Sequence, residues 1–411
     1  MLTRASAGLI PHAVTPLRRV GAAMTPGNGT SGTFRAPEER ARRHDLDALR
    51  AVFLLFGIPY HAALTVRPGP WIANMHERSR DFIQLADYLH LFRMPGFYMI
   101  AGYFAAMLLQ RRPVASYLPS RLHRLVPPFL AGTLLLVPAM HFLLLVETGH
   151  PQPLVRWWEI MTWAERNPFE HLWFVQVLLY YTAGLAGLVW LFPGLAHAGI
   201  EGERPGLVRW FVPLTLATGI VLGLCGLGAL QLERYRYLDN FAINFLSARY
   251  ALDYLPWFAL GAILQRIPAL DRRFARFSWM LFLVGLAASI ALVFAARSIP
   301  LVWRPVFTGV AAICLTQASL GALAYFIDGE RRWVKALVSA SFVIYLFHEP
   351  LIVLATPWID LAPLPIWPKF ILLCLTAFLG SYGIWKLIRL SPALRYLFNG
   401  ERVKRRIEYG P

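Results

Sequence analysis

Apolar runs of about membrane-spanning length recur along the whole chain and dominate its pattern. The hydrocarbon core of a bilayer is about 30 Å thick, so an α-helix needs about 20 mostly apolar residues to cross it. Short polar segments rich in Arg separate the runs. We expect ten transmembrane helices, at residues 46–65, 82–109, 125–146, 171–192, 208–230, 250–266, 278–296, 303–326, 335–356 and 368–388. The pattern predicts an all-α, polytopic integral membrane protein.

Composition agrees with this prediction and excludes a soluble domain. Hydrophobic residues make up 57% of the chain and charged residues only 15%, whereas about a quarter of the residues of soluble domains are charged. In a soluble protein the net charge of +17 would suggest binding to nucleic acid. Here the basic residues are spread among the loops between apolar runs, so we expect contact with the lipid bilayer and no nucleic acid.

Two basic tails flank the expected membrane domain. Residues 1–43 are rich in Pro, Gly, Ser, Thr and Arg without a sustained apolar run, which predicts a disordered tail. The ten-helix domain is expected at 44–395, and a second tail at 396–411. Ten spans put both tails on one side, and that side then holds 27 Lys and Arg against 11 on the other. Because cytoplasmic loops carry the excess of Lys and Arg, both termini are predicted to be cytoplasmic.

Ionisable residues inside the predicted spans are the candidates for function, because charge is costly in a membrane. Asp47 and Arg50 are three residues apart, so they share one face of the first helix and can pair. His61 lies eleven residues after Arg50, which is about 16 Å along an α-helix. The second predicted helix carries His90 and Arg93 on one face. These positions predict a polar path through the membrane domain.

Four histidines from four different spans are predicted to lie at similar depth, in the half of the membrane away from the tails: His61, His90, His171 and His348. Each also has a simpler interpretation, because a lone histidine can be an interfacial anchor or a buried neutral group. Arg50 and Arg93 can likewise serve only to pair helices. Imidazoles suit zinc, but the set contains no i, i+4 pair, so we expect no metal site.

Four stretches of the chain resemble the motifs of the membrane acyltransferase-3 family, and within it the group that succinylates osmoregulated periplasmic glucans. The stretches are Leu46–Arg50 continuing to Gly57–His61, which matches an Arg-x10-His signature; His90–Met94 leading to Ala101–Phe104; His171–Phe174; and Ser341–Leu351. Together they cover the membrane part of the chain from about residue 44 to 400. Their order along the chain is more specific than any one of them.

This resemblance implies an O-acyltransferase of the bacterial inner membrane. Its donor substrate would be cytoplasmic acyl-CoA, with succinyl-CoA expected, and no cofactor would be permanently bound. Its acceptor would be a hydroxyl of a periplasmic glucan or another polysaccharide. Two departures stand out: Ala101 replaces a frequent Ser, and Val175-Gln176-Val177 replaces the Glu-rich motif of relatives that acylate O-antigens. The second departure removes an acidic partner for a catalytic base, and the family motif assigns no role to Glu349.

The resemblance and the residue types together suggest roles for the candidate residues. His61 is expected to be the general base, because an imidazole can accept a hydroxyl proton near neutral pH. Arg93 or His348 is expected to stabilise the oxyanion, or Arg93 to bind a succinyl carboxylate. The remaining candidates are expected to bind substrate: Arg50, Arg121 and Arg124 the phosphates of CoA, His171 and Trp173 the sugar, and Asp47 and His90 as further contacts. No Ser or Cys is clearly placed beside His61, which favours direct transfer over a covalent acyl-enzyme.

Three other functions remain open from the sequence. The protein can be an O-acetyltransferase of another surface polysaccharide, with the same chemistry on a different acyl group. It can be a proton-coupled secondary transporter that uses the intramembrane His, Asp and Arg as a relay, although no repeat of two related halves is found. It can also be a non-catalytic scaffold, for which replacing His61 would have no effect.

Overall fold

The computed structural model describes residues 43–162, 169–199, 202, 205–234, 246–295, 298–327 and 331–401. The tail expected at 1–43 lies outside the described residues except for its last residue, Arg43. The part of the second expected tail from residue 402 onward also lies outside them, whereas residues 396–401 are described. The helix α18 (Pro392–Asn399) runs across the expected start of that tail.

The described residues contain helices and no strand. Ten long helical segments match the ten expected runs: α1 (His44–Leu55) with α2 (Gly57–Val66), α3 (Asp81–Arg111), α4 (Val114–Ala131) with η1 (Gly132–Leu136) and α5 (Val137–Glu147), η2 (Glu170–Leu172) with α7 (Trp173–Leu191), α10 (Phe211–Arg234), α12 (Ala248–Leu264), α14 (Trp279–Phe294), α15 (Arg304–Phe326), α16 (Arg332–Asp360) and α17 (Ile366–Ile388). Four shorter helices connect them: α6 (Pro153–Thr162), α8 (Gly194–His197), α9 (Pro205–Arg209) and α13 (Pro268–Phe274).

The all-α, polytopic membrane architecture is confirmed, but the number of spans is smaller than ten by length and composition. In the described part of the chain, eight helices are long and apolar enough to cross a membrane, and a ninth span results if α13 and α14, bent by 68°, are counted as one. Fewer than ten helices qualify because two of the expected spans form short helices: α12 has 17 residues and α14 has 16. At 1.5 Å per residue, 17 residues reach only about 26 Å.

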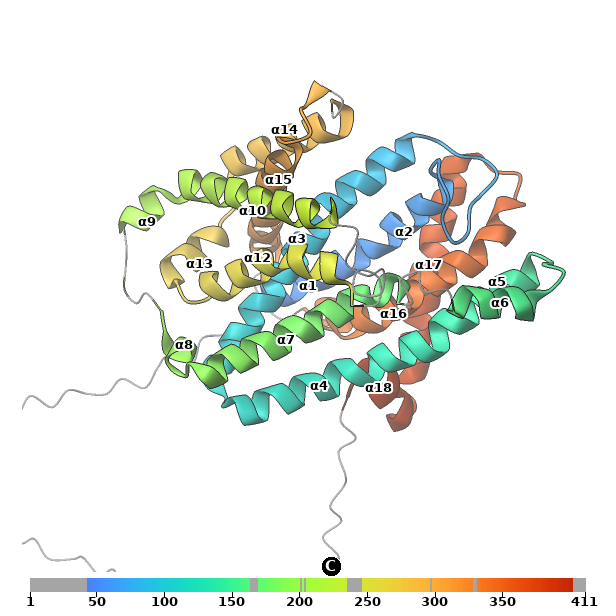
Figure 1. Cartoon of the computed structure of the whole chain (residues 1–411), viewed down its shortest axis with the longest axis horizontal. Coiled ribbons are helices and arrows are strands. Elements are labelled where there is room, and N and C mark those ends of the chain that lie inside the picture. The colour runs from blue at the N-terminus through green and yellow to red at the C-terminus, as the bar shows by residue number, and fades with distance from the viewer. Residues whose placement is uncertain are drawn as a thin grey trace, which may run out of the picture. The chain divides into compact units, whose positions relative to one another are not determined.

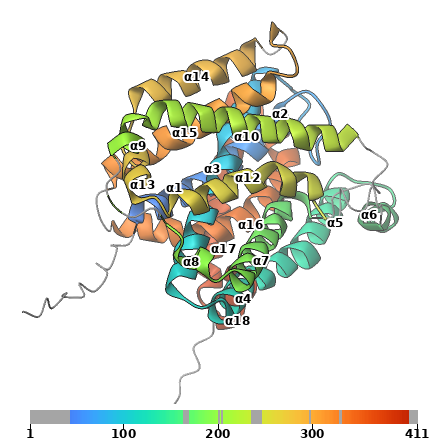
Figure 2. The same cartoon turned by 60° about the vertical axis from the view of Figure 1, so that its left-hand side comes forward.

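The third helix is the centre of the membrane domain. α3 contacts α1, α2, α7, α12 and α15, and Figures 1 and 2 show it between the group of α10, α14 and α15 and the group of α16 and α17. Its buried side chains include Phe92, Tyr98 and Ile100. Side chains of α3 can therefore contact side chains from several other helices. An internal site is expected to include residues of α3.

The first span is broken where the sequence predicted a continuous helix. α1 ends at Leu55, Phe56 forms a turn and α2 begins at Gly57. Pro59 explains the break, because a proline has no N–H and its ring clashes with the carbonyl of the residue four positions earlier, here Leu55. The break lies between Arg50 and His61, so the two residues do not belong to one regular helix.

The basic loop expected between the second and third spans is largely helical. α4 already begins at Val114, eleven residues before the expected start of the third span. Arg121 and Arg124 therefore lie on a helix, where their spacing of three residues puts them on one face.

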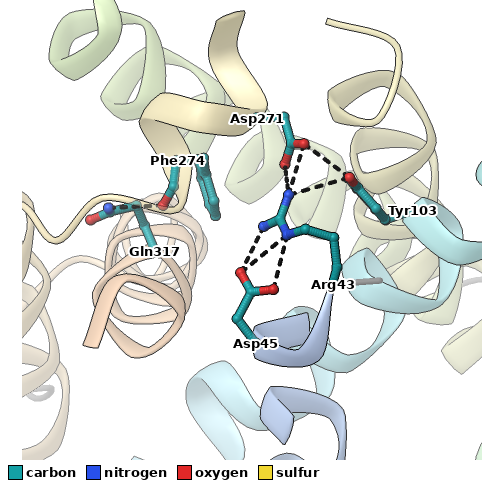
Figure 3. A network of polar contacts seen from close by, with 6 residues as sticks. All are labelled: Arg43, Asp45, Tyr103, Asp271, Phe274 and Gln317. Atoms are coloured by element: carbon teal, nitrogen blue, oxygen red, sulfur yellow. Dashed lines mark hydrogen bonds and ion pairs between the residues drawn. The ribbon is translucent and has the colours of Figure 1, made fainter. Parts of the chain in front are cut away.

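A network of ion pairs joins the start of α1 to α13 (Figure 3). The Arg43 guanidinium lies 2.8 Å from Asp45 Oδ2 and 2.8 Å from Asp271 Oδ2, and the Tyr103 hydroxyl donates to Asp271 at 2.9 Å. Burial opposes the charge of Arg43, but the two carboxylates outweigh it and raise the pKa of Arg43 above its ordinary value. Arg43 thus holds α1, and with it Arg50, in a defined place against α3 and α13.

Candidate active site

A cavity of about 280 Å³ lies among the helices that carry the four histidines. Three of these histidines line it, together with aromatic and charged residues from α2, α3, η2, α7, α12, α16 and the segment between α2 and α3. The polar and aromatic lining residues are Tyr60, His61, Trp71, His90, Arg93, Glu170, His171, Trp173, Tyr250, Tyr345 and Glu349. We call this cavity the histidine chamber.

The histidines converge as the topology predicted. The ring centroid of His61 lies 5.1 Å from that of His348 and 6.2 Å from that of His171, and the centroids of His171 and His348 are 5.5 Å apart. His90 lines the same chamber, stacked on Tyr60 with a centroid separation of 5.1 Å. Residues from four separate spans thus form one site, although this geometry alone tests none of their roles.

Glu349 is the acidic partner that the sequence analysis did not assign. Its carboxylate is 2% exposed, and Oε2 lies 2.9 Å from His61 Nδ1 and 3.4 Å from His171 Nδ1. A buried carboxylate needs such partners, because an isolated charge away from water is costly. A proton on the Nδ1 that faces a carboxylate leaves the lone pair of the imidazole on Nε2.

His348 has a different environment from His61. It is 1% exposed and does not line the chamber, but packs behind His61 and His171. Its Nδ1 donates to the carbonyl oxygen of Tyr345 at 2.6 Å. Since a carbonyl only accepts, the neutral ring carries its proton on Nδ1 and has a lone pair on Nε2. Neutral His348 therefore cannot donate from Nε2 to an oxyanion, which disfavours the role expected for it.

Arg93 is a buried cation facing the chamber. It is 7% exposed, and its guanidinium carbon lies 4.5 Å from the centre of the Tyr60 ring. Among the described residues, no carboxylate lies within 4 Å of it. A Cβ at Gly57 would come within 3.0 Å of both Arg93 Nη1 and His348 Nε2. The glycine at the break between α1 and α2 therefore lets the guanidinium reach this position.

Stacked aromatic rings form one wall of the chamber. Trp173 stacks on Tyr250 with centroids 3.9 Å apart, and both line the chamber; Tyr254, which does not line it, lies 5.8 Å from Trp173 with its ring nearly parallel. Tyr250 and Tyr254 come from α12, far along the sequence, and only the fold places them beside Trp173. Flat aromatic faces of this kind suit the apolar faces of sugar rings.

A second cavity, of about 90 Å³, contains the three arginines expected to bind phosphate. Arg50 from α1 and Arg121 and Arg124 from α4 line it, and we call it the arginine cavity. Arg50 also pairs with Asp47 at 3.4 Å, which confirms the pairing predicted from their spacing. Asp47 itself lines neither cavity.

The two cavities lie back to back. The side chains that line both are apolar: Leu54, Phe97 and Phe174. On α3, the arginine cavity is lined by residues 97–105 and the histidine chamber by residues 90–97. The cavities therefore occupy successive stretches of the same helix, one basic and one rich in histidine, with an apolar wall between them.

Comparisons with known proteins identify the family of the chain. The acyltransferase-3 profile, described as an acyltransferase domain, matches residues 43–386. The chain is 27% identical over 389 residues to two proteins called glucans biosynthesis protein C, from Escherichia coli O6:K15:H31 and Escherichia coli K12, and the match covers 90% of this chain and 97% of each relative. No solved structure matches the chain. The extent of the profile match shows that the protein is an acyl-transferring membrane enzyme of the acyltransferase-3 family.

Proposed function

We propose that this enzyme transfers a succinyl group from cytoplasmic succinyl-CoA to hydroxyls of a glucan on the opposite side of the bacterial inner membrane. The observation that supports this most directly is the pair of cavities that share Leu54, Phe97 and Phe174. One is suited to an anionic donor and the other to acid–base chemistry. A glucan acceptor is suggested by the name of the relatives from Escherichia coli. Cytoplasmic termini are supported by the excess of Lys and Arg on the side of the tails.

The donor binds at the arginine cavity in this proposal. Guanidinium groups bind phosphate oxygens in pairs, and Arg50, Arg121 and Arg124 converge there from two helices. The long, thin pantetheine arm of CoA passes between the apolar side chains of the shared wall. Its thioester then reaches the histidine chamber while the charged nucleotide stays at the cytoplasmic end.

His61 is the general base, and Glu349 orients it. The acceptor hydroxyl oxygen attacks the thioester carbonyl carbon while His61 Nε2 takes the hydroxyl proton. The carbonyl oxygen becomes an oxyanion in the tetrahedral intermediate. The C–S bond then breaks, the carbonyl re-forms, and His61 passes its proton to the departing thiolate. The products are a sugar ester and free CoA, and no covalent acyl-enzyme forms.

Arg93 stabilises negative charge that the substrate brings or develops. A guanidinium that is 7% exposed and has no carboxylate within 4 Å among the described residues is available for an anion. That anion is the oxyanion of the tetrahedral intermediate, or the free carboxylate of the succinyl group. His348 packs against His61 and helps to position its ring, rather than donating to the oxyanion.

An assay with purified enzyme in lipid nanodiscs tests this proposal. Radiolabelled succinyl-CoA or acetyl-CoA is supplied with a neutral glucan, and ester formation is measured for the native protein and for His61→Ala. We expect succinyl transfer by the native protein and at least a 100-fold loss in the variant, because acid–base catalysis contributes about 10²–10⁴-fold. A preference for acetyl-CoA would overturn the proposed donor, and unchanged transfer by His61→Ala would remove the residue from the role of base.

A further inference from the structure

A third cavity adjoins the histidine chamber and has no part in the mechanism above. It has a volume of about 440 Å³ and lies among α3, α10, α12 and α15, which Figure 2 shows side by side. His90 lines both this cavity and the histidine chamber, and its Nε2 lies 3.4 Å from the hydroxyl of Tyr254, which lines the new cavity. We call it the lateral cavity. Its volume lies within the range of about 300–1,000 Å³ that is usual for ligand sites.

Most of the lining of the lateral cavity is apolar, but three ionisable side chains also face it. Asp87 from α3, Asp253 from α12 and Arg304 from α15 all line it. Asp87 is exposed, and Asp253 lies 3.8 Å from Arg249, an ion pair of ordinary surface type. Ionisable groups on transmembrane helices are rare and face polar cavities rather than hydrocarbon. An acyl chain of a lipid would gain nothing from these three side chains.

A sugar unit can use both parts of this lining, whereas the acyl chain of a lipid can use only the apolar part. Its hydroxyls can donate to the carboxylates of Asp87 and Asp253 and accept from the guanidinium of Arg304. Trp257 and Pro95 also line the cavity and offer apolar surface to the C–H groups of a sugar ring. The cavity is lined by two carboxylates and one guanidinium, so it favours a neutral ligand with many hydroxyls over an anion or a cation.

The lateral cavity also lies on the acceptor's side of the molecule. On α3 it is lined by residues 87–95, whereas the arginine cavity is lined by residues 97–105 of the same helix. An acceptor in the lateral cavity can therefore reach the histidine chamber past His90, without crossing the apolar wall of Leu54, Phe97 and Phe174 that separates the donor.

From these observations the geometry points to the lateral cavity as a subsite for the acyl acceptor. It holds a neutral saccharide unit of the polymer next to the unit that is acylated in the histidine chamber. This inference rests on the proposed function, in which the acceptor is a glucan.

Gly226 provides a direct test. It lines the lateral cavity, and a Cβ built on it meets no heavy atom within 4 Å, so Gly226→Leu fills the cavity without pressing on the backbone. Gly228 on the same helix also has no heavy atom within 4 Å of its Cβ and does not line the cavity, so Gly228→Leu is the matched control. Asp87→Asn is a second variant, and Asp81→Asn at the exposed start of α3 is its control.

The measurement is steady-state transfer from succinyl-CoA in nanodiscs to glucan oligosaccharides of one to four units. We expect Gly226→Leu to raise the KM for the tetrasaccharide at least tenfold, with the KM for succinyl-CoA within twofold of the native value. Asp87→Asn raises the tetrasaccharide KM by a smaller factor. Both controls behave like the native protein. In the native protein we expect kcat/KM to increase as the acceptor is lengthened from one to four saccharide units. In Gly226→Leu we expect no such increase.

The other outcomes distinguish a failure of the subsite from a failure of the proposed function. If the native protein transfers to glucan and Gly226→Leu leaves the tetrasaccharide KM unchanged, the lateral cavity is not an acceptor subsite although the proposed function stands. If native mass spectrometry finds a retained phospholipid that Gly226→Leu displaces, with acceptor kinetics unchanged, the occupant is a lipid and the inference is wrong. If the native protein transfers nothing to any saccharide, the proposed function fails and the subsite fails with it.

Discussion

Replacing Glu349 with Gln removes a negative charge that lies 2.9 Å from His61 Nδ1 and 3.4 Å from His171 Nδ1. The two side chains have nearly the same volume, so the packing of this 2% exposed position is kept. The amide can still accept from one histidine, but it no longer stabilises the imidazolium that forms when His61 takes the acceptor's proton.

The size of the effect follows from this geometry. A well-placed acid–base group contributes about 10²–10⁴-fold to a rate, and Gln keeps part of the orientation. We therefore expect kcat to fall about 100-fold, which corresponds to about 2.7 kcal/mol in the activation barrier. The KM for succinyl-CoA stays within about twofold, because the donor's charged part binds at the arginine cavity, on the far side of the apolar wall.

The assay is steady-state succinyl transfer to glucan by purified protein in nanodiscs, with thermal unfolding measured on the same samples. Asp360→Asn is the matched control, because Asp360 lies on the same helix, has a side chain that is 7% exposed, and pairs with His76 and with Lys369, outside the chamber. A kcat for Glu349→Gln within threefold of the control, with normal unfolding, would refute the role of Glu349 as the partner of His61.

Three further replacements test other parts of the site and of the fold. Arg93→Met lowers kcat about 10²–10³-fold for both succinyl-CoA and acetyl-CoA if Arg93 stabilises the oxyanion, whereas a loss confined to succinyl-CoA assigns it to the succinyl carboxylate. Arg121→Ala raises the KM for acyl-CoA about tenfold with little change in kcat, as a titration of initial rates would show, and an unchanged KM places the phosphates elsewhere. Arg43→Ala leaves the carboxylates of Asp45 and Asp271 without their cation (Figure 3) and lowers the free energy of unfolding by about 2 kcal/mol. Denaturant titration checks this, and equal stability of the variant would contradict it.

The fold was predictable because lipid constrains it strongly. A chain that crosses the membrane must satisfy its backbone within helices, and so each apolar run became a helix. The depth of the histidines followed from counting residues along those helices, and they do converge. The break at Phe56 was not predicted, although Pro59 gave the signal for it four residues after Leu55.

The parts of the site that the sequence analysis did not predict depend on contacts between helices that are distant in the chain. Glu349 directly follows His348, but sequence adjacency does not tell whether it faces lipid or the chamber, and only the packing of α16 against α2 brings it to His61. Tyr250 stacks on Trp173 from a helix that begins 75 residues later in the chain. No periodicity in the sequence connects these pairs.

The most direct test of the account is mass spectrometry of periplasmic glucans from a bacterial strain that lacks its own glucan acyltransferase and expresses either this protein or its His61→Ala variant at equal levels. The account predicts glucans with succinyl mass increments in the first strain and unmodified glucans in the second. Unmodified glucans in both strains would contradict the proposed donor and acceptor, and succinylated glucans in both would contradict His61 as the base.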